Sequence, residues 1–291
     1  MDTKKAGVLA ILAASVMWAV EPILTKVAAR STDFLQIATT RSIVSALIAL
    51  GYVCLTNRGN LKVPRRHVPR LVYIGVVGTV VADLLYVLSL TKIPVINAVL
   101  LGHMQPIFIV LIGFFFLKED RLTLFDYLGI LLMVAAGLLV TTKTPVNLSA
   151  LRLGSSGDLL VLVATFAWAT TAVVMRKYLR DLNAGVLVFY RFLIGAVVFV
   201  SYIIATTALS VTSVCQVLVG VVVGVGSVLY YEGLKRIKAA QVSALELATP
   251  FFAAALAYFL LSESFTAMQV VGIILLVPGI HFLSRKEEAY F

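Results

Sequence analysis

Ten apolar segments follow one another along this chain, and each is about 20 residues long. A helix of that length crosses the hydrocarbon core of a bilayer, which is about 30 Å thick. We expect helices because lipid offers no hydrogen-bonding partners to an open backbone. The sequence therefore predicts an all-α integral membrane protein. The segments are 7–29, 34–56, 69–90, 94–117, 122–142, 157–178, 185–207, 213–234, 239–261 and 266–284.

The composition supports the same fold class. Of the 291 residues, 61% are hydrophobic and 13% are charged, and the mean hydropathy is +1.03. A soluble domain is about 45–50% apolar and about 25% charged. This chain has too little polar surface for a soluble fold, and the short connections between segments leave no room for a separate soluble domain.

The basic residues predict the orientation in the membrane. The formal net charge is +10, and most of the 24 Lys and Arg residues fall on one side of the ten-helix arrangement. Loops rich in Lys and Arg face the cytoplasm. We therefore interpret the excess charge as a topology signal and expect no nucleic-acid partner. The expected location is the prokaryotic plasma (inner) membrane, crossed many times, with both termini in the cytoplasm.

An internal duplication constrains the arrangement of these helices. Residues 7–49 match 157–199 at an offset of 150, and residues 86–119 match 230–263 at an offset of 144. Each copy holds five segments, so the second copy must cross the membrane in the opposite direction. We predict two inverted five-helix repeats, over 1–145 and 157–291, around a central cavity that holds the substrate. The matched pairs include Gly7/Gly157, Trp18/Trp168, Lys26/Arg176, Arg41/Arg191, Tyr86/Tyr230, Pro106/Pro250 and Glu119/Glu263.

The order of the duplicated motifs resembles the EamA-type transporters of the drug/metabolite transporter superfamily. FYRFLIGAVV contains Arg191 and is echoed by TTRSIVSAL around Arg41. TKIPVINAVLLGHMQPIF and KRIKAAQVSALELATPFF follow at matching places, and a Gly-rich last segment closes each copy. The resemblance implies ten spans around a central cavity, cytoplasmic termini, and transport of small molecules, often export.

Ionisable groups inside apolar segments are costly and therefore mark functional candidates. Glu21 lies in the first segment, three residues after Trp18, so the two side chains share one helix face. Pro22 frees the backbone carbonyl of Trp18 because a proline cannot donate to it. We predict a polar pocket beside an aromatic ring. The alternative is that Glu21 is the structural partner of a buried arginine.

The fourth segment of the second copy carries a stripe of small or polar residues. Ser243, Glu246 and Pro250 lie at helical spacing, and His103 and Pro106 lie in the matching part of the first copy. A proline kink beside small residues opens space between helices. We predict that Ser243, Glu246 and His103 line the cavity and that Pro22, Pro106 and Pro250 kink their helices. For His103, ordinary packing is the alternative.

The third segment of each copy carries a second face with aromatic and polar residues. Asp83 precedes Tyr86 by three residues, as Ser227 precedes Tyr230. Helix packing or a position at the membrane interface is the alternative for the tyrosines. The complete predicted substrate-binding set is Trp18, Glu21, Asp83, Tyr86, His103, Trp168, Tyr230, Ser243 and Glu246.

Arg41 and Arg191 occupy matching positions, and the inversion predicts one near each membrane face. Each could close a gate by pairing with an acid or a carbonyl in one state only. The alternatives are a lasting pair with an acidic partner or a long side chain that reaches the interface. Lys26 and Arg176, at segment ends, are interpreted as anchors. We interpret Glu263 and its counterpart Glu119 as helix-start residues for the segments that follow them.

The sequence contains no arrangement typical of an enzyme. There is no Gly-rich phosphate loop with Lys-Ser/Thr, no paired histidines at metal-ligand spacing and no Ser-centred nucleophile elbow. We therefore expect no catalysis, no cofactor and no metal. The expected partners are a small-molecule substrate, the lipid bilayer and a proton as co-substrate.

The sequence favours a secondary active transporter that exports a small metabolite, such as an amino acid or an amine, by alternating access. A low-dielectric environment favours the neutral form of a carboxyl group, so Glu21 or Glu246 could carry a proton. An alternative gives the acids and aromatic rings to an organic cation, such as a choline-like quaternary ammonium, taken up by the cell. A channel is a further alternative. Substrate, direction, coupling ion and oligomeric state are left open by the sequence.

Overall fold

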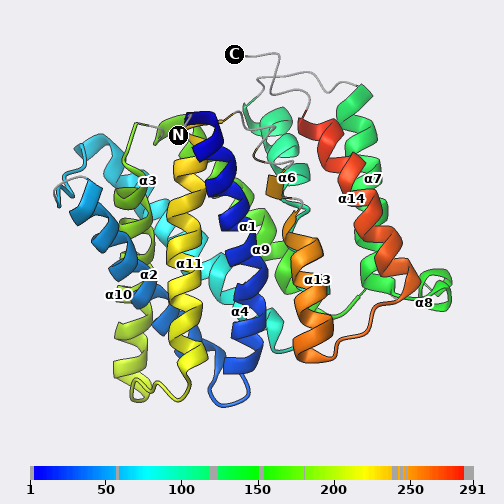
Figure 1. The fold of residues 1–291 in the computed structure, drawn as a ribbon, viewed down its shortest axis with the longest axis horizontal. Coiled ribbons are helices and arrows are strands. Elements are labelled where there is room, and N and C mark those ends of the chain that lie inside the picture. Colours follow the sequence, from blue (N-terminus) through cyan, green and yellow to red (C-terminus); the bar gives the residue numbers. More distant parts are fainter. Residues whose placement is uncertain are drawn as a thin grey trace.

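A computed structural model describes residues 3–56, 59–117, 124–150, 154–179, 181–237, 242, 245–246 and 248–284. Every regular element in these ranges is helical (Figure 1). In the first half the elements are α1 (Thr3–Ala28), α2 (Phe34–Thr56), η1 (Arg65–His67), α3 (Val68–Tyr73), η2 (Ile74–Asp83), α4 (Leu84–Leu90), α5 (Val95–Gly102), α6 (Gln105–Ile112), η3 (Gly113–Leu117) and α7 (Leu124–Thr142). They are followed by α8 (Pro145–Ser149), α9 (Ser156–Tyr178), α10 (Ala184–Thr206), α11 (Val214–Leu234), α13 (Ala248–Leu261) and α14 (Ala267–Ser284).

Eight of the described helical stretches are long and apolar enough to cross a membrane, and two shorter apolar helices lie in α13 and α14. The prediction of a helical membrane protein is therefore confirmed. The ninth expected segment is represented mainly by α13, because most of the residues just before this helix lie outside the described ranges. The eight stretches are Thr3–Ala28, Phe34–Thr56, Arg65–Leu90, Val95–Phe115, Leu124–Thr142, Ser156–Met175, Ala184–Thr206 and Val214–Leu234.

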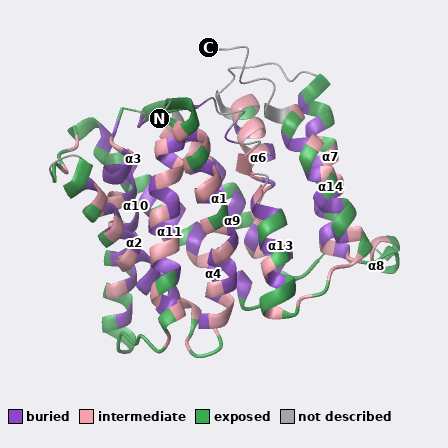
Figure 2. Cartoon of the chain, in the orientation of Figure 1, coloured by how far each residue is buried: buried purple, intermediate pink, exposed green. Residues whose placement is uncertain are grey.

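The outer surface of the bundle is apolar where it would meet lipid. Exposed positions run along the outer sides of the helices (Figure 2). Many are large hydrophobic residues, such as Leu47 on α2, Leu131 on α7 and Phe259 on α13, each more than half exposed. Water-facing surfaces of soluble proteins rarely expose large continuous apolar areas. This surface therefore matches a bilayer and explains why hydrophobic side chains remain outside the protein core.

Helices of the first half pack mainly against helices of the second half. α1 lies against α11 and α13, while α9 lies against η2, α4, α5 and α6. α2 packs on α10 and α11, and α10 packs on η2. α7 and α14 form a pair at one side of the bundle (Figure 1). The two halves of the chain are therefore interleaved in space.

Glycines allow the closest of these approaches. A Cβ placed on Gly224 of α11 would lie 2.9 Å from the Ser45 Cα of α2, so only glycine lets the two backbones meet there. Gly220, one turn earlier, also leaves no room for a Cβ atom, which would meet the Val44 side chain. Ser45 then donates a hydrogen bond across the contact to the Gly220 carbonyl, at 2.9 Å. Small residues thus bring α2 and α11 into backbone contact.

Two of the spans are irregular. The third changes from α3 to the π-helix η2 and then to α4. Such helices are rare and occur frequently at functional sites. The fourth span is interrupted at His103 and Met104, and Pro106 lies in the first turn of α6. Pro22 lies inside the continuous helix α1, and Pro250 lies near the start of α13.

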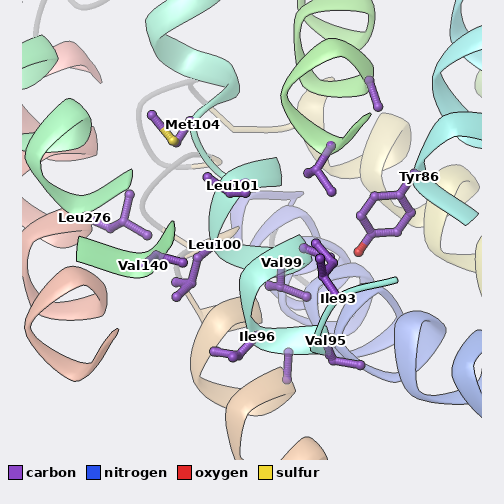
Figure 3. Close-up of a cluster of buried hydrophobic side chains, with 14 of the residues drawn as sticks. Tyr86, Ile93, Val95, Ile96, Val99, Leu100, Leu101, Met104, Val140 and Leu276 are labelled. Carbon is purple, nitrogen blue, oxygen red and sulfur yellow. The ribbon is translucent and has the colours of Figure 1, made fainter. Parts of the chain in front are cut away.

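The largest apolar cluster surrounds α5. All residues of this helix from Val95 to Leu101 are buried. Figure 3 shows Tyr86, Val140 and Leu276 around side chains of this helix, which are Val95, Ile96, Val99, Leu100 and Leu101. These neighbours come from α4, α7 and α14. A short helix whose residues are nearly all apolar requires burial on every side, and its polar residue Asn97 is buried with them. α5 therefore lies inside the bundle, enclosed by elements of both halves.

Candidate functional site

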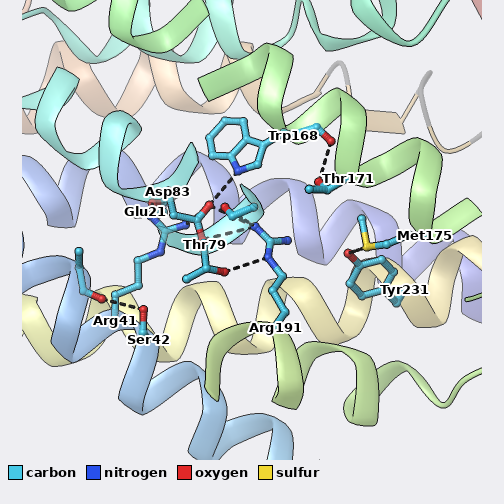
Figure 4. A network of polar contacts seen from close by, with 12 residues as sticks. Glu21, Arg41, Ser42, Thr79, Asp83, Trp168, Thr171, Met175, Arg191 and Tyr231 are labelled. Carbon is cyan, nitrogen blue, oxygen red and sulfur yellow. Dashed lines mark hydrogen bonds and ion pairs between the residues drawn. The ribbon is translucent and has the colours of Figure 1, made fainter. Parts of the chain in front are cut away.

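Four charged side chains meet inside the bundle (Figure 4). Glu21 comes from α1, Arg41 from α2, Asp83 from the end of η2 and Arg191 from α10. The side chains are 7%, 5%, 2% and 13% exposed in that order. The structure thus brings together the two acids and the two arginines that the sequence singled out separately.

Asp83 connects the two arginines. Its Oδ1 lies 3.5 Å from Arg41 Nη2 and 3.1 Å from Arg191 Nη2. Arg41 Nη1 also lies 2.9 Å from Glu21 Oε1. The four formal charges therefore cancel within the network. Both long side chains extend to the same carboxylate, so Arg41 and Arg191 each have an acidic partner inside the bundle.

Hydrogen bonds that involve η2 and α9 hold the Asp83–Arg191 side of the network. Arg191 donates from Nε to Thr79 Oγ1 at 3.3 Å and from Nη2 to the Gly78 carbonyl at 3.4 Å. Trp168 donates from Nε1 to Asp83 Oδ1 at 2.8 Å. Asp83 therefore accepts hydrogen bonds from an indole as well as a guanidinium. The sequence analysis missed Thr79, whose spacing of four residues before Asp83 places both on one face.

The Glu21–Arg41 side of the network is less complete. Glu21 Oε1 and the Arg41 Nε and Nη1 atoms are buried and have no hydrogen-bond partner among the described residues. The short distance between Glu21 and Arg41 is an ion pair without hydrogen-bond geometry. Buried polar groups are nearly always hydrogen-bonded, so each exception requires an explanation. The pairing with Arg41 is nevertheless the structural role that we considered as the alternative for Glu21.

Two pairs of aromatic rings flank the network. Trp18 of α1 lies against Tyr230 of α11, with ring centroids 4.9 Å apart and a 51° angle between the planes. Tyr86 of α4 lies against Trp168 of α9, at 5.2 Å and 56°. Each pair joins the two halves of the chain. The four predicted aromatic residues therefore lie in two similar contacts, each made of a Trp from one half and a Tyr from the other.

The remaining predicted site residues lie outside this network. His103 follows α5, and its Nδ1 is 2.7 Å from the Val99 carbonyl oxygen. The same ring interacts with the backbone of Glu246. Glu246 is partly buried next to Leu245, whose carbonyl accepts a hydrogen bond from Ser15 of α1. Ser243 lies outside the described residues.

Lys26 and Glu263 form a second ionic contact away from the centre, at 2.6 Å. Lys26, which the sequence places at the end of its segment, therefore has an acidic partner within the protein. Glu263 was expected to begin the segment that follows it, but its side chain accepts from the Val95 backbone N–H at the start of α5. The helix that it caps is close in space and distant in sequence, so no local pattern could have revealed it. Its counterpart Glu119 lies outside the described residues.

The described residues of the bundle interior offer charged and aromatic side chains. They contain no group of three or more His, Cys, Asp or Glu side chains that could hold a metal ion. The central network offers a carboxylate and a guanidinium with unused hydrogen-bonding atoms, flanked by aromatic rings. Such a site can hold a small polar molecule within the membrane.

Comparison with known proteins identifies relatives over nearly the whole chain. The Pseudopaline exporter CntI of Pseudomonas aeruginosa strain UCBPP-PA14 is 27% identical over 291 residues, which cover 99% of each chain. An uncharacterized transporter of Methanothermobacter thermautotrophicus is 22% identical and covers 95% of this chain and 85% of its own length. A solved crystal structure has the same fold, with a TM-score of 0.67, 19% identity, and coverage of 97% of this chain and 98% of that one.

The model of the EamA-like transporter family matches residues 5–142 and 155–285, one match in each half. The matches include every charged residue of the central network. The resemblance inferred from the duplicated motifs is thus confirmed. This membrane protein belongs to the EamA-like transporter family, and its role is transport.

Proposed function

We propose that this transporter exports a small zwitterionic metabolite, such as an amino acid, by alternating access. The observation that carries the proposal is the buried Glu21–Arg41 pair. Both side chains have atoms that lack hydrogen-bond partners among the described residues. A carboxylate can accept two parallel hydrogen bonds from a guanidinium, and an ammonium can donate to Glu21. A zwitterion would satisfy both groups and bring no net charge into the membrane.

We infer that the halves are inverted repeats of five helices each, because equivalent helices make equivalent contacts. If α1 corresponds to α9, and η2 with α4 corresponds to α11, then the α1–α11 contact corresponds to the contact of α9 with η2 and α4. The α2–α11 and α10–η2 contacts correspond in the same way. The Trp18–Tyr230 and Trp168–Tyr86 ring contacts also correspond. Alternation between such repeats exposes a midplane site to each side in turn.

The choice of export rests on the relative named as an exporter. It aligns with this chain from end to end at 27% identity. Full-length alignment is compatible with the same cycle of conformations, and export is therefore the direction we propose. The substrate named for that relative is a property of that protein, and the zwitterion proposed here rests on the chemistry of the site.

The organic-cation alternative is less well supported. Binding of an organic cation would require carboxylates beside the aromatic rings that are not already paired with an arginine. Asp83 lies close to both arginines, and Glu21 is paired with Arg41. An amine without a carboxylate would add a positive charge to a network whose four formal charges already cancel, and an uncompensated charge is costly inside a membrane.

Proton coupling follows from the same pair. A proton and a substrate ammonium would compete for Glu21, so binding of one favours release of the other. This competition is the basis of antiport, in which a proton entering the cell drives substrate out. Glu246 is the second candidate carrier, because it is an acid in the fourth span of its half, beside the ring of His103.

The decisive experiment is counterflow into proteoliposomes that contain the purified protein. Three related probes separate the chemical requirements: an amino acid, the amine formed by its decarboxylation, and its N-acetyl derivative. We expect exchange of the amino acid alone. Glu21→Gln should reduce exchange about 10- to 100-fold, the effect of losing one charge-assisted hydrogen bond. The exposed Arg66, replaced by Gln, is the control and should leave exchange unchanged.

Other outcomes would identify the alternatives. Exchange of the amine but not the amino acid would support the organic-cation hypothesis, and unitary conductance in a planar bilayer would support a channel. A second set of vesicles carries an imposed pH gradient. Indifference of wild-type flux to this gradient would exclude proton antiport, and comparison of Glu21→Gln with Glu246→Gln would identify the carrier.

A further inference from the structure

A second polar cluster closes the end of the bundle that lies opposite the N-terminus. Glu263 belongs to the link between α13 and α14, which lies at that end in Figure 1. Lys26 lies in the last turn of α1, and Val95 begins α5. The charge distribution of the loops assigns this end to the outside of the cell. Three distant parts of the chain therefore meet at the outer end.

The cluster fixes the start of α5. Lys26 Nζ lies 2.6 Å from Glu263 Oε1 and donates to the Ile93 carbonyl at 2.9 Å. Glu263 accepts from the Val95 backbone N–H with both oxygens, at 2.9 and 3.1 Å. The residue that precedes α5, Pro94, provides no side-chain cap. Glu263 therefore supplies the acceptor that the helix start lacks, and an anion is favoured there.

Further contacts attach the next turn of α5 to the second half. Asn97 donates to Asp158 Oδ1 of α9 at 2.9 Å, and Gln269 of α14 donates to Asn97 Oδ1 at 2.8 Å. These three side chains are buried. The Lys26 and Glu263 side chains are 27% and 12% exposed, so water has better access to this pair. Water can replace the partners of a charged pair at lower cost when the pair is near the surface.

We propose that the Glu263–Lys26 contact on the start of α5 is the latch that holds the outer end of the transport pathway closed. This inference rests on the proposed alternating-access function. α5 runs from this end toward His103, and its residues from Val95 to Leu101 are buried inside the bundle. In this proposal α5 forms the outer wall of the pathway. Release of Glu263 frees the first turn of α5 from the link between α13 and α14, while the contacts of Asn97 with Asp158 and Gln269 continue to hold the next turn. The latch then opens and closes once in each transport cycle.

The test measures how fast a reagent added outside the cell reaches a position on the inner side of the latch. Ile23 is buried one turn before Lys26 in α1 and belongs to the apolar cluster around Val95. Cys54 and Cys215 are first replaced by Ser, and Ile23→Cys is the reporter. A membrane-impermeant maleimide is then applied to the outside of intact cells. Glu263→Gln keeps an acceptor for the Val95 N–H but loses the charge, and we expect labelling about tenfold faster.

Glu232→Gln is the matched control. Glu232 of α11 is also ion-paired, with Arg236 two residues after that helix, and both lie outside the Glu263–Lys26 cluster. Its substitution should leave labelling of the reporter unchanged. Lys26→Met provides a second variant that keeps the apolar stem of the side chain, and it should accelerate labelling as Glu263→Gln does.

The labelling experiment requires no substrate, so its result is separate from that of the counterflow experiment. Equal labelling rates in wild type, Glu263→Gln and Lys26→Met would overturn the latch even if amino acid exchange is observed. Faster labelling in both variants would support the latch, even if the transported molecule differs from the zwitterion proposed above. Faster labelling in the Glu232→Gln control to the same extent would also overturn it, since the effect would then be general loosening.

Discussion

Asp83 is the residue that joins the other members of the central network. It lies within ion-pair distance of Arg41 and Arg191 and accepts the indole hydrogen bond of Trp168. The sequence identified Asp83 because an acid within an apolar segment requires a reason. Its three partners come from α2, α10 and α9, and no spacing in the sequence relates them to Asp83. The residue could be predicted, and its partners could not.

Replacement of Asp83 by Asn should destabilise the protein strongly. The change leaves two buried arginines with one acid, and removal of one partner from a buried ion pair costs about 3–5 kcal/mol. We expect a lower melting temperature in detergent, measured by scanning fluorimetry. Asp33→Asn is the control, because this exposed residue caps α2 through Leu35 N and Gln36 N and Asn caps equally well. Equal melting temperatures for Asp83→Asn and wild type would contradict the ion network.

Among the elements, α2 and α11 show how glycines position the site. Gly220 and Gly224 let α11 approach the backbone of α2, which carries Arg41 three residues before Val44. Small residues are typical of close helix contacts in membranes, so the sequence alone marks these glycines as packing positions. The partner helix was not predictable, since the same stripe could have packed against any small-residue surface. The π-helix η2, which positions Thr79 and Asp83, also has no recognisable sequence signature.

Gly224→Ala tests this contact at the level of the two helices. The added methyl group would meet the Ser45 Cα, which cannot move without shifting α2. Overpacking of this kind costs about 1–3 kcal/mol, and we expect a lower melting temperature. Gly51→Ala on α2 is the matched control, because nothing lies within 4 Å of its added Cβ. It should be neutral or slightly stabilising through helix propensity. A neutral Gly224→Ala would show that α2 and α11 are farther apart.

At the scale of the whole molecule, the halves of the duplication do not form separate bodies. α1, α2 and α7 find their main partners in α11, α10 and α14. Each half therefore leaves a large surface uncovered when it stands alone. The duplication in the sequence predicts two related units. It does not reveal that long helices such as α1, α2 and α7 pack mainly on the other unit.

Division of the chain near α8 tests this interleaving. The short helix α8 joins the halves, and Val146 within it is 74% exposed, so a break there removes few contacts. We expect the two fragments to copurify when they are expressed together. Each fragment alone should aggregate or be degraded, because its inner helix surfaces lack partners. Size-exclusion chromatography of the tagged fragments measures both outcomes. A stable single fragment would contradict the interleaved arrangement.

The sequence by itself determined the membrane location, the helical fold class, the duplication and the transporter family. These properties depend on segment length, apolar content and motif order, which are local along the chain. The sequence also identified the ionisable residues of the central network. A charged residue is exceptional within an apolar segment, whichever residue is its partner. Only the tertiary structure decided that Glu21, Asp83 and two arginines neutralise one another, and that Glu263 caps α5. Those pairings join residues that are far apart in the chain, and the free energy of a buried charge depends on which partner the fold brings within reach.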